Sequence, residues 1–222
     1  MCGIVGFLTK KNFDYKKIIK IMSDSIIHRG PDSYGDYQDL DKGVFLGFRR
    51  LAIIDLSDNA SQPIHSFDQR FAMVFNGEIY NFSELKKIIL NKSKSSINFK
   101  SHSDSEVLVN AFAILGLRET LDLVSGQFSI CLYDKKLNKF YLIRDRFGEK
   151  PMYYGFINSS FVFASELKAI ELFPNFNKKI SEKALNYYLK FMNVPNELSI
   201  YDNIYKVLPS QVIEIDLNNL QN

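Results

Sequence analysis

Cys2 is the first residue of this sequence whose side chain could do covalent chemistry. It lies in the opening stretch MCGIVGF, and the chain has one other cysteine, Cys131. If Met1 is removed, Cys2 carries both a thiol and a free α-amine, whose ordinary pKa values are about 8.5 and about 8. An amine of that basicity can take the thiol proton and activate the sulfur as a nucleophile. The alternative is that Cys2 is a small apolar residue at a tolerant position.

Three further features have both a functional and a plain structural interpretation. Asn76-Gly77 is commonly a turn dipeptide, although an amide side chain can also hold an oxyanion. Arg50 could bind a carboxylate, but beside Arg49 it could equally be a surface charge. Asp104 opens a predicted helix, where any carboxylate suits the positive end of the helix dipole. Taken alone, none of these residues predicts a function.

The elements that must position these residues are strands interspersed with helices. Strand-like runs are predicted at 2–8, 34–40, 43–48, 50–55, 71–75, 78–82, 127–134, 139–145, 152–157 and 161–165, with two more before Asp216. Asn76-Gly77, between two of these runs, predicts a tight hairpin turn. Helices are predicted from a cap at Asp14 to about Ile26, from a cap at Ser83 over 84–90, from a capping box of Ser103 and Glu106 over 106–115, and near 181–191. This order favours antiparallel sheets layered with helices over regular βαβ units.

The bulk composition excludes several classes of protein. The 222 residues suit one large domain, and the net charge of +3 is spread without a long basic block, so we expect no nucleic-acid and no membrane partner. No stretch has the apolar length of a membrane helix. Two cysteines are too few for a disulfide framework, which indicates a reducing, cytoplasmic setting. The three histidines lack metal-ligand spacing, so no metal site is expected.

Seven motifs, in this order, resemble a known family. They are MCGIVGF, HRGPD, RRLAIID, FNGEIYN, SDSE, SGQFSICLYD and RDRFGEKPMYY. Together they resemble the glutaminase domain of the asparagine synthetase family, one of the class II glutamine amidotransferases with an N-terminal cysteine nucleophile. The resemblance implies an N-terminal nucleophile hydrolase fold of class α+β: a four-layer αββα sandwich of two antiparallel sheets. It covers residues 2–216 and leaves 217–222 as a tail or the start of a linker.

The resemblance also implies the catalytic roles. Cys2, freed of Met1, would attack the side-chain amide of glutamine and form a glutamyl thioester, which water then hydrolyses to glutamate. Asn76, through its side-chain amide, and Gly77, through its N–H, would hold the oxyanion. A Cβ at Gly77 would crowd the approaching substrate carbonyl. Cys131 alternates with core residues and is expected to be a buried, unreactive thiol.

The same resemblance assigns the binding of the amino-acid head of the substrate. Arg50 would pair with the α-carboxylate, while strand alternation should point Arg49 the other way. Asp104, assisted by Glu78, would pair with the α-ammonium. The backbones of Leu51 and Ile53 would line the pocket. The loop 28–32 is expected near the pocket, with no chemical role.

Partners and cofactors follow from what the chain lacks. The SGGxDS phosphate loop of the family's ATP-pyrophosphatase domain is absent, so no cofactor is expected here; ATP and Mg²⁺ would belong to a synthetase domain or subunit. The expected ligand is L-glutamine, and a homodimer is an open question. Two alternatives stay open: a related amidotransferase supplying ammonia to a sugar or other acceptor, and a glutamine-binding or docking module without turnover.

Overall fold

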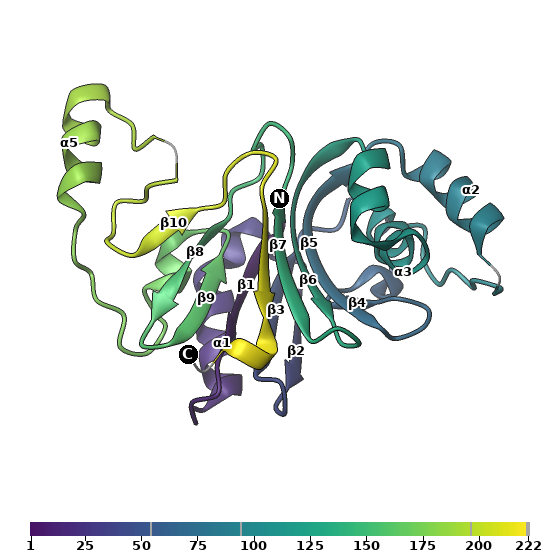
Figure 1. Cartoon of the computed structure of the whole chain (residues 1–222), viewed down its shortest axis with the longest axis horizontal. Coiled ribbons are helices and arrows are strands. Elements are labelled where there is room, and N and C mark those ends of the chain that lie inside the picture. The colour runs from purple at the N-terminus through teal and green to yellow at the C-terminus, as the bar shows by residue number, and fades with distance from the viewer. Residues whose placement is uncertain (54, 94, 196, 221–222) are drawn as a thin grey trace.

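Two antiparallel sheets form the centre of the molecule in the computed structural model, which describes residues 1–53, 55–93, 95–195 and 197–220 (Figure 1). The first sheet contains, in spatial order, β10 (Ile204–Lys206), β8 (Tyr153–Ile157), β9 (Ser160–Ala164), β1 (Gly3–Leu8), β3 (Val44–Arg50) and β2 (Ser33–Asp39). The second contains β11 (Val212–Asp216), β7 (Lys139–Arg144), β6 (Gly126–Asp134), β5 (Phe71–Ile79) and β4 (Ile64–His65). Short 3₁₀ turns lie at Ile27–Arg29, Asp58–Ala60 and Leu217–Asn219.

Helices cover the outer faces of both sheets. They are α1 (Tyr15–Ser25), α2 (Phe82–Lys92), α3 (Asp104–Leu123) and α4 (Leu167–Ile170). A fifth helix, α5 (Glu182–Phe191), stands away from the sheets (Figure 1). Helices α1 and α4 pack on the first sheet, and α3, with α2 beside it, packs on the second (Figure 1). A third apolar core lies between the sheets, where side chains of β1 and β3 meet those of β5, β6 and β7. This arrangement confirms the predicted α+β class and the four-layer αββα sandwich.

Several local predictions are confirmed because their signals are local. Helix α1 begins after Asp14, whose carboxylate accepts a hydrogen bond from Lys17 N at 3.2 Å. Its apolar face is fully buried, as predicted: Ile18, Ile19, Met22 and Ile26. Ser103 caps α3 by accepting from Glu106 N at 3.3 Å. The capping box is only half formed, because the Glu106 carboxylate accepts from the N–H groups of Lys100 and Ser101 instead.

The predicted hairpin turn at Asn76-Gly77 is wrong. Both residues lie inside the continuous strand β5, where they pair with Ser129 and Phe128 of β6. Neither has the positive φ that a two-residue hairpin turn needs. The dipeptide therefore belongs to the interior of a strand, and β5 joins the run 71–75 to the first two residues of the run 78–82. The rest of that second run is wrong as a strand, since residues 80–81 form a turn and Phe82 begins α2.

Two element boundaries also differ from expectation. The run 50–55 was predicted as a strand, but β3 ends at Arg50, and residues 51–53 and 55–57 form a loop; Ile54 lies outside the described residues. The Ile53 side chain is 73% exposed, as expected for a loop residue and not for a buried strand. Helix α2 begins at Phe82 after Asn81, which makes the predicted cap at Ser83 wrong by two residues.

Met1 lies just before β1 of the first sheet, whereas the last described residues follow β11 of the second sheet. Leu217, the first residue after the predicted domain boundary, is buried in the core between the sheets. The boundary itself stays a prediction. Among the described residues, none of the helices combines the length and apolar character needed to cross a bilayer.

Candidate active site

One cavity of about 150 Å³ gathers all the residues that the sequence proposed for a site. They are Cys2, Arg50, Leu51, Ile53, Asn76, Gly77, Glu78 and Asp104. Cys2 directly precedes β1 and Arg50 ends β3, both of the first sheet, whereas Asn76 comes from β5 of the second. The cavity therefore lies where the two sheets and the start of α3 meet.

The Cys2 thiol is held against the backbone of Leu51. Leu51 N donates to Sγ at 3.4 Å, and Sγ lies 3.7 Å from Leu51 O. Burial raises the pKa of the Cys2 thiol, and the hydrogen bond from Leu51 offsets this only in part. At neutral pH the sulfur is therefore a thiol, and a nearby base is needed to make it a nucleophile.

Asn76 offers the cavity an unused hydrogen-bond donor. The residue is 1% exposed, and its Nδ2 has no hydrogen-bond partner within the part of the chain that the structure describes. A buried donor without a partner costs about 1–3 kcal/mol, which a ligand oxygen in the cavity would recover.

Gly77 is required by the sheet itself. A Cβ there would lie 2.2 Å from Gln127 O and 2.6 Å from Phe128 Cα, both in β6. The sequence analysis explained Gly77 by the room that a substrate carbonyl needs. The steric constraint in the structure is a different one, the close approach of β6. Glycine lets β5 and β6 approach closely at the cavity wall.

Arg50 and Arg49 point in opposite directions, as strand alternation predicts. The Arg50 guanidinium donates to the carbonyl of Asp55 and, at 2.8 Å, to that of Ser57. Arg49 instead pairs with Asp24 on α1, at the outer face of the sheet. Of the two arginines, Arg50 therefore lines the cavity, as Lys150 also does, and the loop after β3 holds Arg50 in place.

Asp104 places a buried carboxylate across the cavity. The residue is 6% exposed and accepts a hydrogen bond from Ile79 N at 2.9 Å. The pKa of Asp104 is raised to about 6. Burial is the main cause, and the neighbouring charge of Glu78 contributes to the same rise. The carboxylate lacks a basic side-chain partner among the described residues, so a cationic ligand would find it unpaired.

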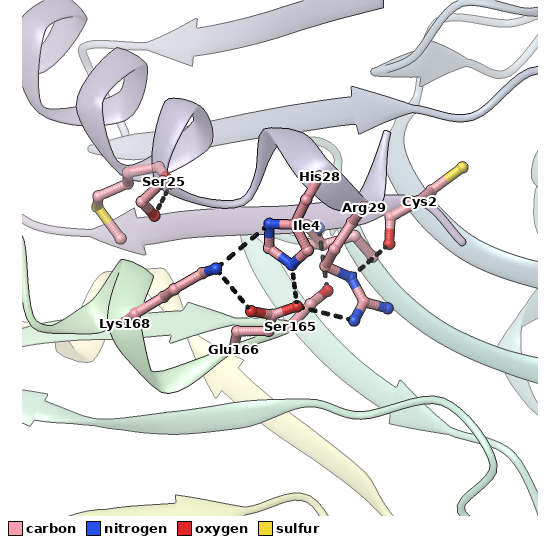
Figure 2. Close-up of polar contacts among 9 residues, drawn as sticks. Cys2, Ile4, Ser25, His28, Arg29, Ser165, Glu166 and Lys168 are labelled. Atoms are coloured by element: carbon pink, nitrogen blue, oxygen red, sulfur yellow. Dashed lines mark hydrogen bonds and ion pairs between the residues drawn. The ribbon is translucent and has the colours of Figure 1, made fainter. Parts of the chain in front are cut away.

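Sequence reasoning missed two residues around Cys2. Arg29, in the loop 28–32 that was given no chemical role, donates from Nε to Cys2 O at 3.0 Å (Figure 2). Asp55 accepts from His102 N at 2.8 Å and so ties the loop after β3 to the start of α3. The motif HRGPD could have indicated a role for Arg29. No local feature of the sequence indicated that Asp55 contacts the start of α3.

The described residues contain no group of three or more His, Cys, Asp or Glu side chains placed to hold a metal ion. The site is instead a thiol, a free amide donor, a cation and an anion around one small cavity. Such a set can bind a zwitterionic amino acid by its head and present a carbonyl to a nucleophile.

Comparison with known proteins identifies the class. Residues 1–222 match the family described as the glutamine amidotransferase domain, and the chain belongs to that family. Two solved structures share the fold with a TM-score of 0.64. One is the allosteric regulatory enzyme of purine biosynthesis, 20% identical over 77% of this chain and 43% of that one. The other is the glutamine phosphoribosylpyrophosphate amidotransferase of B. subtilis, 16% identical over 97% of this chain and 49% of that one.

Curated relatives are closer in sequence. The chain is 36% identical to asparagine synthetase (glutamine-hydrolyzing) 1 of Bacillus subtilis (strain 168), covering 97% of this chain and 33% of the relative. It is 34% identical to putative asparagine synthetase (glutamine-hydrolyzing) 2 of Methanocaldococcus jannaschii, covering 98% and 44%. These similarities confirm the family that the seven motifs indicated. The chain spans about a third to under half the length of these relatives.

Proposed function

We propose that this chain hydrolyses the side-chain amide of L-glutamine and supplies the ammonia to an asparagine-synthetase-like enzyme. The observation that carries the proposal is the single cavity in which the half-buried Cys2 thiol and the unpartnered amide of Asn76 lie between the cation Arg50 and the anion Asp104. The names of the curated relatives support glutamine as the substrate.

The head of glutamine would be held by opposite charges. Arg50 pairs with the α-carboxylate through a planar guanidinium that the carbonyls of Asp55 and Ser57 already orient. Asp104 pairs with the α-ammonium, with Glu78 assisting at the exposed side. The backbones of Leu51 and Ile53 line the remaining wall.

The chemical step requires that Met1 be absent. Met1 lines the cavity and is 56% exposed, a position open to a peptidase. Once Met1 is removed, the Cys2 α-amine takes the thiol proton as Sγ bonds to the amide carbon, and the carbonyl electron pair moves onto oxygen. Asn76 Nδ2 and Gly77 N–H hold that oxyanion.

Collapse of the tetrahedral adduct completes the first half of the reaction. The C–N bond breaks, the amine returns its proton to the departing nitrogen, and ammonia leaves a glutamyl thioester on Cys2. Water then attacks the thioester carbon, giving its proton to the same amine, and the C–S bond breaks. Glutamate is released with the thiol restored.

The ammonia needs an acceptor beyond this chain. We place it in an ATP-pyrophosphatase-type synthetase domain or subunit, which would also hold ATP and Mg²⁺; this chain needs no cofactor for the hydrolysis. We assign the reaction to the cytoplasm, where thiols stay reduced. A related amidotransferase with a sugar acceptor would use the same cavity.

The proposal is tested by glutamine hydrolysis. The chain without Met1 should release glutamate and ammonia in equal amounts, and Cys2→Ala should abolish both. Equal rates from the two proteins would contradict the proposed function. Calorimetric binding of glutamine without glutamate formation would favour the binding module instead.

A further inference from the structure

Cys2 becomes the chain terminus when Met1 is removed, and few contacts then hold it. Strand β1 begins at Gly3, so the nucleophile itself lies outside the ladder of sheet hydrogen bonds. Its thiol contacts the backbone of Leu51, and its carbonyl accepts from Arg29 Nε. A terminal residue with so few restraints frays unless those restraints are rigid.

Arg29 is the side chain that fixes the main chain of Cys2, and it needs a counter-charge. Its side chain is 8% exposed, and its Nη2 has no partner among the described residues. A buried guanidinium is strongly destabilising without a paired anion. Glu166 provides that anion by accepting from Nη1 at 3.1 Å (Figure 2).

Glu166 is itself anchored to the strand that starts at the nucleophile. The residue before it, Ser165, donates its N–H to Ile4 O at 2.8 Å. Ser165 Oγ accepts from Ile4 N at 3.0 Å. The backbone of Glu166 is therefore held next to β1, two residues after Cys2, and a closed chain of contacts runs from Cys2 through Arg29 and Glu166 back to Ile4.

Two further side chains, His28 and Lys168, contact the Glu166 carboxylate but do not contact Cys2. His28 Nε2 lies 2.9 Å from Oε1, and Lys168 Nζ lies 3.3 Å from Oε2 (Figure 2). Lys168 Nζ also lies 3.2 Å from His28 Nδ1. His28 and Lys168 are half-exposed and orient Glu166, whereas Arg29 alone connects it to the nucleophile.

We propose that Glu166 is a positioning residue for the nucleophile: it holds the Arg29 guanidinium against the Cys2 carbonyl and thereby aims the thiol and α-amine at the substrate. The inference rests on the proposed function. Glu166 does not line the cavity, so it acts on the attack and not on the binding of glutamine.

The test is Glu166→Gln, with Glu171→Gln as the matched control. Glu171 is another partly buried glutamate, at the end of α4, where it pairs with Lys178 and accepts from Tyr201 at 2.9 Å. We expect Glu166→Gln to lower kcat on the order of tenfold to a hundredfold, with KM for glutamine changed by less than about twofold. Glu171→Gln should leave both unchanged. A kcat equal to the wild type, or a loss confined to KM, overturns the proposal.

A second readout separates positioning from general damage. The rate of Cys2 alkylation by iodoacetamide, followed against pH by mass spectrometry, reports the pKa of the thiol. Without the Glu166 charge, the Arg29 cation next to Cys2 is uncompensated, so Glu166→Gln should lower that pKa while Glu171→Gln does not. An unchanged profile overturns the proposal. This assay needs no turnover: a wild type that does not hydrolyse glutamine contradicts the proposed function, while the profile still decides on Glu166.

Two further variants test whether the loss of kcat comes from misfolding, or from an effect of Glu166 that does not involve Arg29. Glu166→Asp keeps the charge on a shorter side chain, so kcat should fall while the thiol pKa stays near the wild type; a wild-type kcat overturns the proposal. Arg29→Ala combined with Glu166→Gln should be no slower than Arg29→Ala alone, because both act through one contact. Multiplicative losses in the double variant would also overturn it.

Discussion

Asp104→Asn tests how the cavity recognises the charged head of glutamine. In the proposed complex the carboxylate of Asp104 neutralises the α-ammonium, and it can do so only when ionised. Burial raises the pKa of this carboxyl to about 6, so its charge is lost within a pH range where proteins remain folded. Affinity for glutamine should therefore fall as the pH drops through that value.

The size of the effect follows from that pKa. With a pKa of about 6, the ionised fraction falls from about 97% at pH 7.5 to about 9% at pH 5. The affinity of glutamine for Cys2→Ala, which binds the substrate without turnover, should thus decline roughly tenfold over this interval. A charge-assisted hydrogen bond contributes about 1.5–3 kcal/mol, so Asp104→Asn should lower kcat/KM by about ten- to 150-fold at pH 7.5. In the Cys2→Ala background, Asp104→Asn should remove this loss of affinity on acidification.

The assay is calorimetric titration of glutamine into Cys2→Ala across this pH range, because binding without turnover is independent of the Cys2 α-amine acting as base; initial rates of glutamate formation give kcat/KM at pH 7.5. Asp122→Asn is the matched control, because Asp122 lies on the same helix and pairs only with the exposed Arg118. His102→Gln checks a second titratable side chain near the site. Both controls should keep the pH profile of Cys2→Ala. An affinity that is flat down to pH 5 with Asp104 present, or an acidic decline in affinity that persists after Asp104→Asn, would refute the reasoning.

Three further predictions follow from the site and its surroundings. Asn76→Ala should lower kcat by about 10²- to 10³-fold with little change in KM, as steady-state kinetics would reveal, because it removes one oxyanion donor. Gly77→Ala should lower the melting temperature measured by circular dichroism, since its Cβ would clash with Gln127 O; an unchanged melting temperature would mean that the sheet tolerates the methyl group. In the folded protein, iodoacetamide should label Cys2 and spare Cys131, which is fully buried and whose thiol pKa is raised by that burial; mass spectrometry showing two labels without unfolding would contradict this.

Local signals in the sequence predicted the elements that local chemistry determines. The cap at Asp14 and the apolar face of α1 need only residues within three turns of one helix, and both are as expected. Asn76-Gly77 was misread because the same dipeptide suits a turn or a sheet interior. Its partner strand β6 lies some fifty residues further along the chain, and only that pairing decides between the two.

The candidate site was predictable where a motif carried it and unpredictable where tertiary contact creates it. All the site residues that the resemblance named line the cavity, and alternation distinguished Arg50 from Arg49. Glu166 could not be found in this way, since its partner Arg29 is 137 residues distant and each is an ordinary charge in its own segment. The steric demand on Gly77 likewise exists only once β6 is beside it.

The most direct test compares glutamine hydrolysis by two preparations of the same chain, one starting at Cys2 and the other retaining Met1, each verified by intact mass. The account predicts that only the protein with a free Cys2 α-amine turns over glutamine, with a rate proportional to its fraction in mixtures of the two. Full activity of the Met1-retaining protein, per molecule, would contradict the claim that one residue supplies both the nucleophile and its base.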